Sequence, residues 1–324
     1  MKIGGRNVII SQVDILNING VGIEGVAACI PDNCETNDRK VAEATGIFTR
    51  RIADDGVTGL DLCVRAAERV IADTKSSPDD FRAVVAVSFT QHDRMPCNAA
   101  QAQARLRLPK GILAFDVMQA CAGYGYGLYV SGLLARETGG KVLLLDGDKQ
   151  SEFVNRADAS TVPVLADGGT ASVISPLAVG TGADWQFAFM SDGAKGDALK
   201  LSHGGAIAMD GFGVFRFVAT DVVGYLKEFI LKAKLDLSTL NAFVPHQANV
   251  YMVRQLAAGI GVPVEKLKIS ADRFGNLSSA SIPATLAATA TTGKVLLAGF
   301  GGGLSFSAAA IDIAADCRFA VVGD

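Results

Sequence analysis

The alternation of apolar runs and amphipathic segments along the chain predicts an α/β protein. Residues 59–73 carry apolar side chains at helical spacing and form the clearest amphipathic helix. Further helices are expected over residues 36–44, 98–106, 212–235, 250–261 and 282–291. Apolar runs bounded by turn residues predict buried strands over 21–30, 81–89, 112–117, 141–145, 241–244 and 267–270. Strand–glycine turn–strand units are expected over 162–174 and 294–313, with irregular structure over 175–211.

One stretch, residues 111–134, combines a predicted buried strand with a helix that follows after a short turn. Cys121 lies at that turn, before a segment rich in glycine with apolar residues at helical spacing. A helix N-terminus favours thiolate over thiol, which makes Cys121 a candidate nucleophile. A free cysteine is also commonly a small buried apolar residue, and this stretch alone leaves both interpretations open.

The two halves of the chain repeat each other at a nearly constant spacing. His246 lies 155 positions after Gln91, and Asn276 lies 155 positions after Cys121. The motif KVLLLDGD is echoed by KVLLAGFG 153 positions later. These offsets predict an internal duplication of one α/β unit. If a pseudo-twofold axis relates the copies, the loops after their strands meet at one face, where open α/β sheets bind ligands. The expected halves are residues 1–175 and 176–324.

This duplication would bring Cys121, His246, Asn276 and the 301–303 glycine turn together, because each follows a predicted strand. A cysteine can attack a thioester carbonyl and become acylated. Backbone N–H groups of Cys121 and the glycine turn could stabilise the oxyanion. A histidine and an asparagine that donate to one carbonyl oxygen would stabilise the enolate of a decarboxylating malonyl-type thioester. Taken singly, the histidine could be an ordinary loop residue, and the asparagine and the glycines ordinary turn residues.

Composition narrows the classes of partner. The net charge is −3 and no Lys/Arg-rich run occurs, so neither nucleic acid nor a membrane surface is expected. No apolar stretch reaches the ~20 residues of a membrane span. The N-terminus lacks a signal-peptide pattern, so a cytoplasmic protein is expected. The six cysteines and three histidines are scattered without a CxxC pair, and therefore no metal, disulfide framework or cofactor is expected.

Four ordered motifs resemble those of the β-ketoacyl-acyl-carrier-protein synthase III family of the thiolase superfamily. They are DVMQACAGYGYGL around Cys121, VPHQAN around His246, DRFGNLSSASIPATL around Asn276, and FGGGLSFSAA near the C-terminus. The resemblance implies a five-layered αβαβα thiolase-like fold built from two duplicated halves, and a homodimeric condensing enzyme. It also implies that Cys121 accepts the acyl group and that His246 and Asn276 bind the extender thioester carbonyl. Gly302, with Cys121, would form the oxyanion hole.

The resemblance further implies acyl-coenzyme A or an acyl carrier protein as thioester donor. The family usually holds the coenzyme A adenine with a Trp and an Arg, where this chain has Lys40 and Ala44. Tyr251 replaces a basic residue that often follows HQAN. These departures favour a carrier-protein thioester. Met95 lies where the family places a large aromatic at the partner's acyl pocket, and a flexible methionine could widen that pocket for a non-acetyl starter. The candidate docking residues are Arg216, Asn249 and Arg254.

We therefore expect a decarboxylative Claisen condensation that gives a β-keto product, in fatty-acid or specialised, polyketide-like biosynthesis. An alternative is an acyltransferase that passes the acyl group from Cys121 to an oxygen or nitrogen acceptor without decarboxylation. A second alternative is a silent subunit that shapes an active partner, against which the intact Cys121, His246 and Asn276 argue. The sequence specifies neither the length nor the branching of the acyl group.

Overall fold

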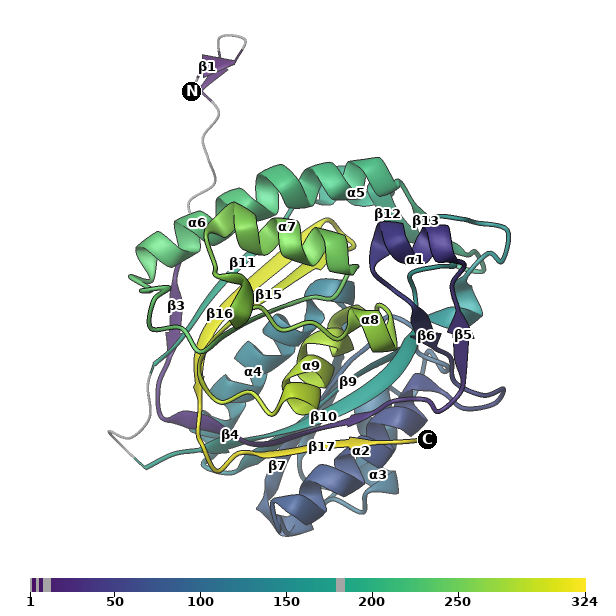
Figure 1. The fold of residues 1–324 in the computed structure, drawn as a ribbon. Coiled ribbons are helices and arrows are strands. Elements are labelled where there is room, and N and C mark those ends of the chain that lie inside the picture. The colour runs from purple at the N-terminus through teal and green to yellow at the C-terminus, as the bar shows by residue number, and fades with distance from the viewer. Residues whose placement is uncertain (1, 4–5, 8–12, 179–183) are drawn as a thin grey trace.

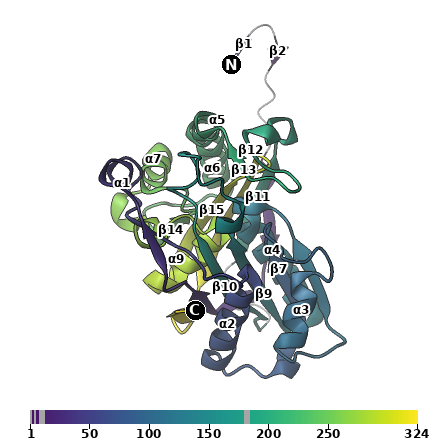
Figure 2. The ribbon, with the colours of Figure 1, turned by 90° about the vertical axis from the view of Figure 1, so that its right-hand side faces the viewer.

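The computed structural model describes residues 2–3, 6–7, 13–178 and 184–324 of the chain. Two large β-sheets are stacked with helices between them and on both outer faces (Figure 1). The side view places the same layers one above another (Figure 2). This arrangement confirms the five-layered αβαβα thiolase-like fold that the resemblance implied. Among the described residues, no helix is long and apolar enough to cross a bilayer.

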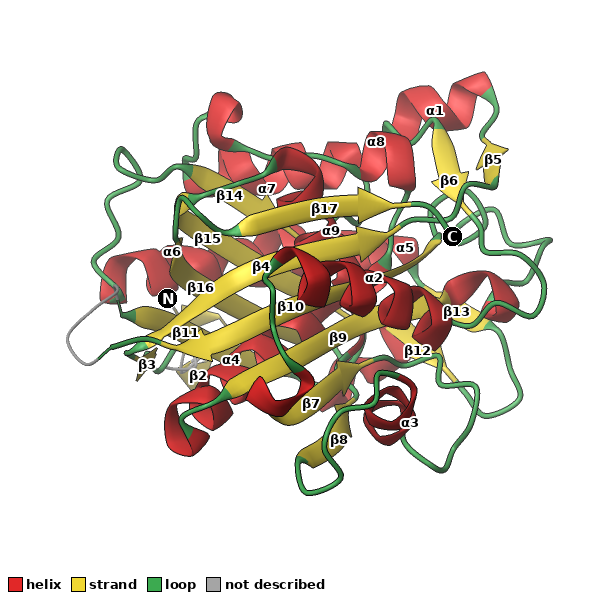
Figure 3. Ribbon diagram, turned by 90° about the horizontal axis from the view of Figure 1, so that it is seen from below, coloured by secondary structure: helices red, strands yellow, loops and turns green. Residues whose placement is uncertain are grey.

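The first sheet contains five strands from the N-terminal half and the last strand of the chain. These are β4 (Val21–Cys29), β7 (Phe81–Val87), β8 (Leu113–Val117), β9 (Lys141–Lys149), β10 (Asp167–Pro176) and β17 (Arg318–Val322). Their order is β17-β4-β10-β9-β7-β8, with β7 parallel to both of its neighbours. Two helices, α2 (Gly59–Asp73) and α3 (Asn98–Arg105), cover its outer face, seen from below in Figure 3.

The second sheet contains β3 (Leu16–Ile18), β11 (Trp185–Ser191), β14 (Ala242–Pro245), β15 (Gly293–Gly301) and β16 (Ser305–Ile313). Their order is β14-β15-β16-β11-β3. Its outer face packs against α7 (Val250–Ile260) and one long helix. That helix comprises α5 (Gly211–Phe217), a π-helical turn (Val218–Val222) and α6 (Val223–Lys232), close to the predicted helix over 212–235.

Two helices, α4 (Gly123–Thr138) and α9 (Ser281–Thr289), form the central layer. Sheets cover both helices above and below, so both are mostly buried, except for the exposed last turn of α4. Tyr124 and Leu128 of α4 pack there with Trp185 and Phe187 of the second sheet. Glycine lets α4 lie close to that sheet, since a Cβ at Gly125 would lie within 2.6 Å of the Cβ of Ser307. The expectation of a buried, glycine-rich helix behind Cys121 is confirmed.

The predicted duplication is visible in the order of the strands. The run β4-β10-β9-β7 of the first sheet corresponds to β11-β16-β15-β14 of the second. Leu267 makes a single parallel bridge with Phe243 of β14, where its counterpart β8 pairs with β7. The two edge strands β17 and β3 cross over, each joining the sheet of the other half. The division of the chain at residue 175 stays a prediction.

Smaller elements line the edges of the sheets. The hairpin of β5 and β6 flanks α1 near α8 at the upper right of Figure 1, and the hairpin of β12 and β13 lies beside α5. A short N-terminal hairpin, β1 with β2, precedes β3. Their bounds are β1 Lys2–Ile3, β2 Arg6–Asn7, β5 Cys34–Thr36, α1 Arg39–Thr45, β6 Thr49–Arg51, β12 Leu199–Leu201, β13 Ile207–Met209 and α8 Ala271–Phe274.

Several predictions about elements are wrong. Residues 162–174 do not form two strands around a glycine turn, because Gly168 and Gly169 lie inside the single strand β10. A Cβ at Gly169 would lie 2.4 Å from the Cys63 nitrogen, so this glycine serves the contact with α2. Strand β8 is an edge strand, and its Leu113 is 49% exposed rather than buried. The predicted strand over 267–270 is reduced to one bridge.

Two further predicted boundaries of elements differ from those in the structure. The segment 175–211 was expected to be irregular, but the end of β10 and the strands β11, β12 and β13 all fall within it. The helix expected from Thr36 begins at Arg39, because the Asp38 side chain accepts a hydrogen bond from the Val41 N–H and caps that helix. Thr36 belongs to β5 instead.

Candidate active site

Cys121 lies in a 3₁₀ turn, Ala120–Ala122, that joins β8 to the N-terminus of α4. Its neighbour Ala120 has a left-handed backbone (φ 39°), which turns the chain sharply before the helix. The Ser307 hydroxyl donates to the Ala122 carbonyl oxygen at 2.9 Å and ties this turn to β16. A Cβ at Gly301 would lie 2.7 Å from the Cβ of Cys121, so glycine is needed for this approach. The turn is therefore held against two neighbouring strands of the second sheet, β15 and β16.

The predicted site residues meet at one cavity. Cys121, His246, Asn276 and Gly302 all line a cavity of about 420 Å³, a volume typical of small-molecule sites. Most of the other lining side chains are apolar, and Lys200 is the only charged one among the described residues that line it. The cavity thus offers an apolar channel that ends at a cysteine, a histidine and an asparagine.

Ser278, which the motif analysis did not single out, contacts all three polar side chains. Its N–H donates to Asn276 Oδ1 at 2.9 Å, and its carbonyl oxygen accepts from His246 Nδ1 at 3.0 Å. Its hydroxyl donates to Cys121 Sγ at 4.0 Å. Ser278 has a left-handed backbone (φ 56°). Its N–H group, carbonyl oxygen and hydroxyl therefore point toward three different partners. Its place two residues after Asn276 is the only signal of this role in the sequence.

His246 follows β14 directly, as predicted, and is only 2% exposed. Since the Ser278 carbonyl oxygen can only accept, we assign the ring proton to Nδ1, which leaves Nε2 as an acceptor. Burial lowers the pKa of His246 to about 4, although the hydrogen bond to Ser278 opposes this, so the ring is neutral at pH 7. The expectation that His246 donates to a carbonyl oxygen therefore requires that Nε2 first gains a proton.

Asn276 is held by its backbone. Its N–H donates to the Val164 carbonyl oxygen at 2.9 Å. Its own carbonyl oxygen accepts from the Ala166 N–H at 3.0 Å and from the Gln150 side chain at 2.7 Å. Because Oδ1 is occupied by the Ser278 N–H, the amide Nδ2 group is left to donate to a ligand.

Cys121 is buried, and burial raises the pKa of its thiol to about 11. Hydrogen bonds from the Ser278 hydroxyl and from the N–H groups of Gly302 and Cys121 lower it, but burial outweighs them. Burial therefore favours the thiol, against the thiolate that the helix N-terminus led us to expect. The two N–H groups aimed at the sulfur are those predicted for the oxyanion hole.

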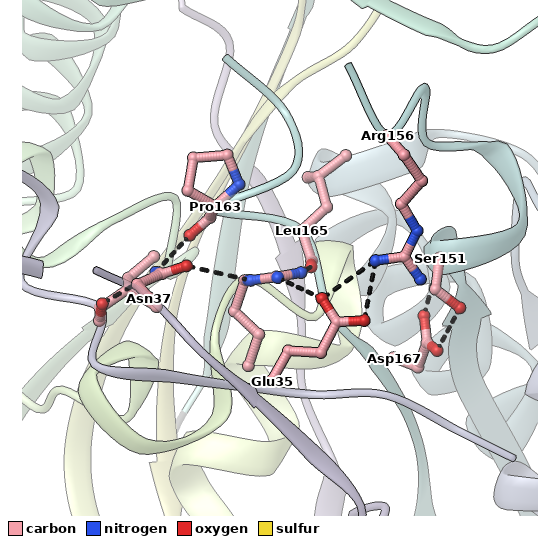
Figure 4. Close-up of polar contacts among 9 residues, drawn as sticks. Glu35, Asn37, Ser151, Arg156, Pro163, Leu165 and Asp167 are labelled. Carbon is pink, nitrogen blue, oxygen red and sulfur yellow. Dashed lines mark hydrogen bonds and ion pairs between the residues drawn. The ribbon is translucent and has the colours of Figure 1, made fainter. Parts of the chain in front are cut away.

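A polar cluster holds one wall of the cavity (Figure 4). Glu35 pairs with Arg50 at 2.5 Å and with Arg156 at 2.7 Å. The Asn37 side chain donates to the Pro163 carbonyl oxygen at 2.8 Å, and Pro163 itself lines the cavity. The cluster therefore fixes the cavity wall to the β5–β6 hairpin. Burial would raise the pKa of Glu35, but hydrogen bonds from both arginines outweigh burial and lower it.

The candidate docking and acyl-pocket residues lie at separate places on the molecule. Asn249 lines the cavity and caps α7, accepting from the Met252 N–H at 2.8 Å. Arg254 is exposed on α7, and Arg216 borders a separate depression beside α5. Met95 is 86% exposed on the loop after β7, outside the cavity of its own chain. Only Asn249 of this group reaches the catalytic cavity.

Known proteins share both sequence and fold with this chain. The family models for 3-oxoacyl-[acyl-carrier-protein] synthase III and for its C-terminal part match residues 115–193 and 230–313. A β-ketoacyl-[acyl-carrier-protein] synthase III of Staphylococcus aureus is 30% identical over 309 residues, covering 90% of this chain and 98% of the relative. A 3-oxoacyl-(acyl-carrier protein) synthase from Burkholderia xenovorans superposes with a TM-score of 0.91, at 28% identity, over 97% of this chain and all of the other.

A further structural relative is the priming β-ketosynthase of the R1128 polyketide pathway, with a TM-score of 0.84 and 27% identity over 91% of this chain and 97% of the other. In the described part of the chain, no group of three or more His, Cys, Asp or Glu side chains could hold a metal ion. The chain belongs to the β-ketoacyl-acyl-carrier-protein synthase III family and is an acyl-thioester condensing enzyme.

Proposed function

We propose that the enzyme transfers an acyl group to Cys121 and then joins it to a malonyl-type thioester with loss of carbon dioxide. The observation that carries this proposal is the shared cavity, in which one sulfur, two N–H donors, an imidazole and a carboxamide face the same space. These groups suit a reaction that forms an oxyanion and then an enolate. The proposal needs no metal and no redox cofactor.

In the first half-reaction, the sulfur of Cys121 attacks the carbonyl carbon of the donor thioester. The oxyanion that forms would accept hydrogen bonds from the Cys121 and Gly302 N–H groups, which already point at the sulfur. Collapse of this intermediate breaks the bond between the carbonyl carbon and the donor sulfur. The donor leaves as a thiol and Cys121 carries the acyl group.

In the second half-reaction, the thioester carbonyl of the extender would accept a hydrogen bond from Asn276 Nδ2. His246 Nε2 adds a second hydrogen bond once it carries a proton. The bond to the carboxylate breaks, carbon dioxide leaves, and the enolate carbon attacks the acyl group on Cys121. The Cys121 sulfur departs and takes the proton from His246 Nε2, which water replaces, so that one proton is consumed overall and a β-keto thioester is released.

We propose an acyl carrier protein as the thioester donor. The lining offers one charged side chain, Lys200, which suits an uncharged pantetheine arm better than the phosphates of a nucleotide. We also propose a homodimer that works in the cytoplasm. Leu113 on the edge strand β8, with Met95 and Met118 nearby in the chain, leaves apolar surface exposed that a second copy would cover.

The test is to incubate the protein with a panel of acyl thioesters, on coenzyme A and on carrier protein, and to measure its intact mass with Cys121→Ala as control. A labelled malonyl thioester is then added and released carbon dioxide is counted. We expect an acyl adduct only on the unaltered protein and carbon dioxide only after acylation. An ester or amide product without carbon dioxide would select the acyltransferase alternative. Absence of any adduct with every donor would overturn the proposal.

Asn276→Ala separates the two half-reactions. Because Asn276 serves only the extender, this variant should still acquire the acyl adduct. Its release of carbon dioxide should fall by about 100- to 1,000-fold, the usual effect of removing one donor from a developing oxyanion.

A further inference from the structure

The side-chain amide of Gln150 has a fully paired nitrogen and, among the described residues, an unpaired oxygen. Gln150 follows β9 directly, is 1% exposed and lines the catalytic cavity. Its Nε2 donates to the carbonyl oxygens of Ala166 and Asn276, each at 2.7 Å. Since both partners can only accept, the nitrogen must face them and the remaining amide atom is the oxygen. No described residue donates a hydrogen bond to that Oε1.

This oxygen is open to the cavity. In the described part of the chain, the fully enclosed side-chain atoms that lack a partner are Ser131 Oγ, Asp146 Oδ2, Asp148 Oδ2 and Asp272 Oδ1. Gln150 Oε1 is not among them, so part of its surface is accessible, and the space that Gln150 borders is the cavity. A nearly buried acceptor without a donor is unfavourable, so a ligand or an ordered water has to supply one.

The amide is held rigidly by its surroundings. The Asn276 carbonyl oxygen that accepts from Gln150 also accepts from the Ala166 N–H at 3.0 Å, so the two partners of Nε2 are tied to each other. The next residue, Ser151, donates to the Asp167 carboxylate through its N–H at 2.9 Å and its hydroxyl at 2.6 Å (Figure 4). An acceptor that is already fixed in place loses little entropy when a ligand binds, which favours discrimination between ligands.

Gln150 and the nucleophile lie at the ends of strands in the same sheet. Strands β9, β7 and β8 are neighbours in that order (Figure 3), and Gln150, Phe89 and Cys121 follow them. All three residues line the cavity. Neighbouring strands are about 4.8 Å apart, so β9 and β8 are separated by about 10 Å. Two side chains and a short acyl chain fill such a span, and an acyl group on Cys121 that runs past Phe89 therefore reaches Gln150.

The lining restricts the kind of donor that suits this oxygen. The described residues that line the cavity include no Asp or Glu, and their one charged side chain is the cation Lys200. An ammonium group on the ligand would enter without a counter-charge, which is costly away from water. A hydroxyl is neutral and donates one hydrogen bond, so it suits a single acceptor among apolar walls.

We propose that Gln150 is a specificity-determining residue that selects an acyl group with a hydroxyl on its α or β carbon. The hydroxyl donates to Gln150 Oε1 while the carbon chain packs beside Phe89. An acyl group without the hydroxyl displaces water from Oε1 and leaves this acceptor unpaired, and is disfavoured for that reason. The inference names the substrate class of the proposed condensation and rests on the proposed acylation of Cys121.

The test compares pantetheine thioesters that differ only in the hydroxyl: butyryl against 2-hydroxybutyryl and 3-hydroxybutyryl, each in both configurations. The rate of adduct formation on the full-length protein is followed by intact mass. We expect at least one hydroxy donor to acylate Cys121 with a kcat/KM about 10- to 100-fold above that of butyryl. Gln150→Met keeps the length of the side chain and removes the acceptor, so this preference should disappear.

The ratio between donors, rather than the absolute rate, is the readout. Gln150→Met also removes the two hydrogen bonds of Nε2, but this loss acts on all donors alike. The matched control is Thr45→Val, because Thr45 also lines the cavity while its hydroxyl donates to the Val41 carbonyl oxygen at 2.8 Å. Thr45→Val should keep the ratio of the unaltered protein. Melting curves show that each variant is folded.

Two results overturn the inference and leave the condensation proposal intact. One is acylation of the unaltered protein without preference for any hydroxy donor, a measurement that needs no variant. The other is a preference that persists in folded Gln150→Met. If Gln150 instead accepts from an amide N–H of the pantetheine arm, the substitution slows every donor equally, and this second result is obtained.

Absence of acylation with every donor would sink the condensation proposal, and a binding measurement then decides the inference. Amide analogues, in which nitrogen replaces the thioester sulfur, are tested for protection of Cys121 against iodoacetamide. Alkylation is followed on the peptide that contains Cys121, because Cys34 is exposed. Half-protection by a hydroxy analogue at a concentration about tenfold lower than by the butyryl analogue, in the unaltered protein but not in Gln150→Met, supports the selection of a hydroxyl. Equal concentrations overturn it.

Discussion

Gly125→Ala tests whether the close contact between α4 and the second sheet holds the nucleophile in place. A Cβ at Gly125 would lie 2.4 Å from Ser307 Oγ, the atom that donates to the carbonyl oxygen of Ala122, next to Cys121. Alanine favours a helix by about 1 kcal/mol over glycine. Overpacking of the core costs about 1–3 kcal/mol, and loss of the buried hydrogen bond costs about 1 kcal/mol. We expect a net loss of about 1–3 kcal/mol in the free energy of unfolding.

Urea denaturation at one protein concentration measures this difference, and intact mass after one acyl thioester measures the rate of acylation. The rate of acylation should fall by more than the rise in unfolded protein accounts for, because the turn that carries Cys121 shifts. The matched control is Gly224→Ala on α6, where a Cβ meets nothing within 4 Å. That variant should gain about 0.5–1 kcal/mol and keep full activity. A Gly125→Ala protein as stable and as reactive as the parent would refute the reasoning.

Three further predictions concern the cavity wall, the docking surface and the acyl pocket. Glu35→Gln leaves buried Arg50 without its carboxylate and should lower the free energy of unfolding by about 1–2 kcal/mol at pH 7, after a discount for the exposure of Glu35. Because the folded-state pKa of Glu35 is lowered, this stabilisation is fully present above the ordinary value of 4.5 and is lost as the pH falls through the folded-state pKa. The free energies of unfolding of the two proteins, measured in urea, should therefore converge as the pH falls below that lowered pKa. Arg254→Glu should raise the KM for an acyl carrier protein by about tenfold and leave the kinetics with a short pantetheine thioester unchanged, whereas an equal effect on both donors would exclude a docking role. Met95→Trp should shift the ratio of kcat/KM values toward shorter acyl donors by about tenfold if Met95 enters the pocket of a second copy, and an unchanged ratio would remove it from that role.

The order of motifs was sufficient to predict the fold layers and the meeting of Cys121, His246 and Asn276, because strand ends of two duplicated units converge. The local glycine signals were harder to interpret. In β10, Gly168 and Gly169 mark close packing inside a strand, whereas a turn was predicted, since one-dimensional patterns do not reveal what lies across from a glycine.

The protonation state of Cys121 also could not be predicted from the sequence. A helix N-terminus behind Cys121 suggested a thiolate, but burial raises the pKa of the thiol to about 11. Burial depends on both sheets and on the cavity wall together, which no local motif encodes. Ser278 was missed for a similar reason, because its contacts with His246 and Cys121 join positions 32 and 157 residues apart.

Burial of the nucleophile and its reactivity are opposed requirements, and the duplicated fold reconciles them. An apolar cavity excludes water from an acyl-cysteine, yet the same exclusion keeps Cys121 protonated and His246 neutral. The charges that develop during the reaction must therefore be stabilised by polar groups of the protein, because water does not reach them. The first half supplies the thiol, and the second half supplies Ser278, Gly302 and Asn276. A site divided in this way depends on the packing of α4 between the sheets, so a substitution there should impair chemistry even when every polar residue remains.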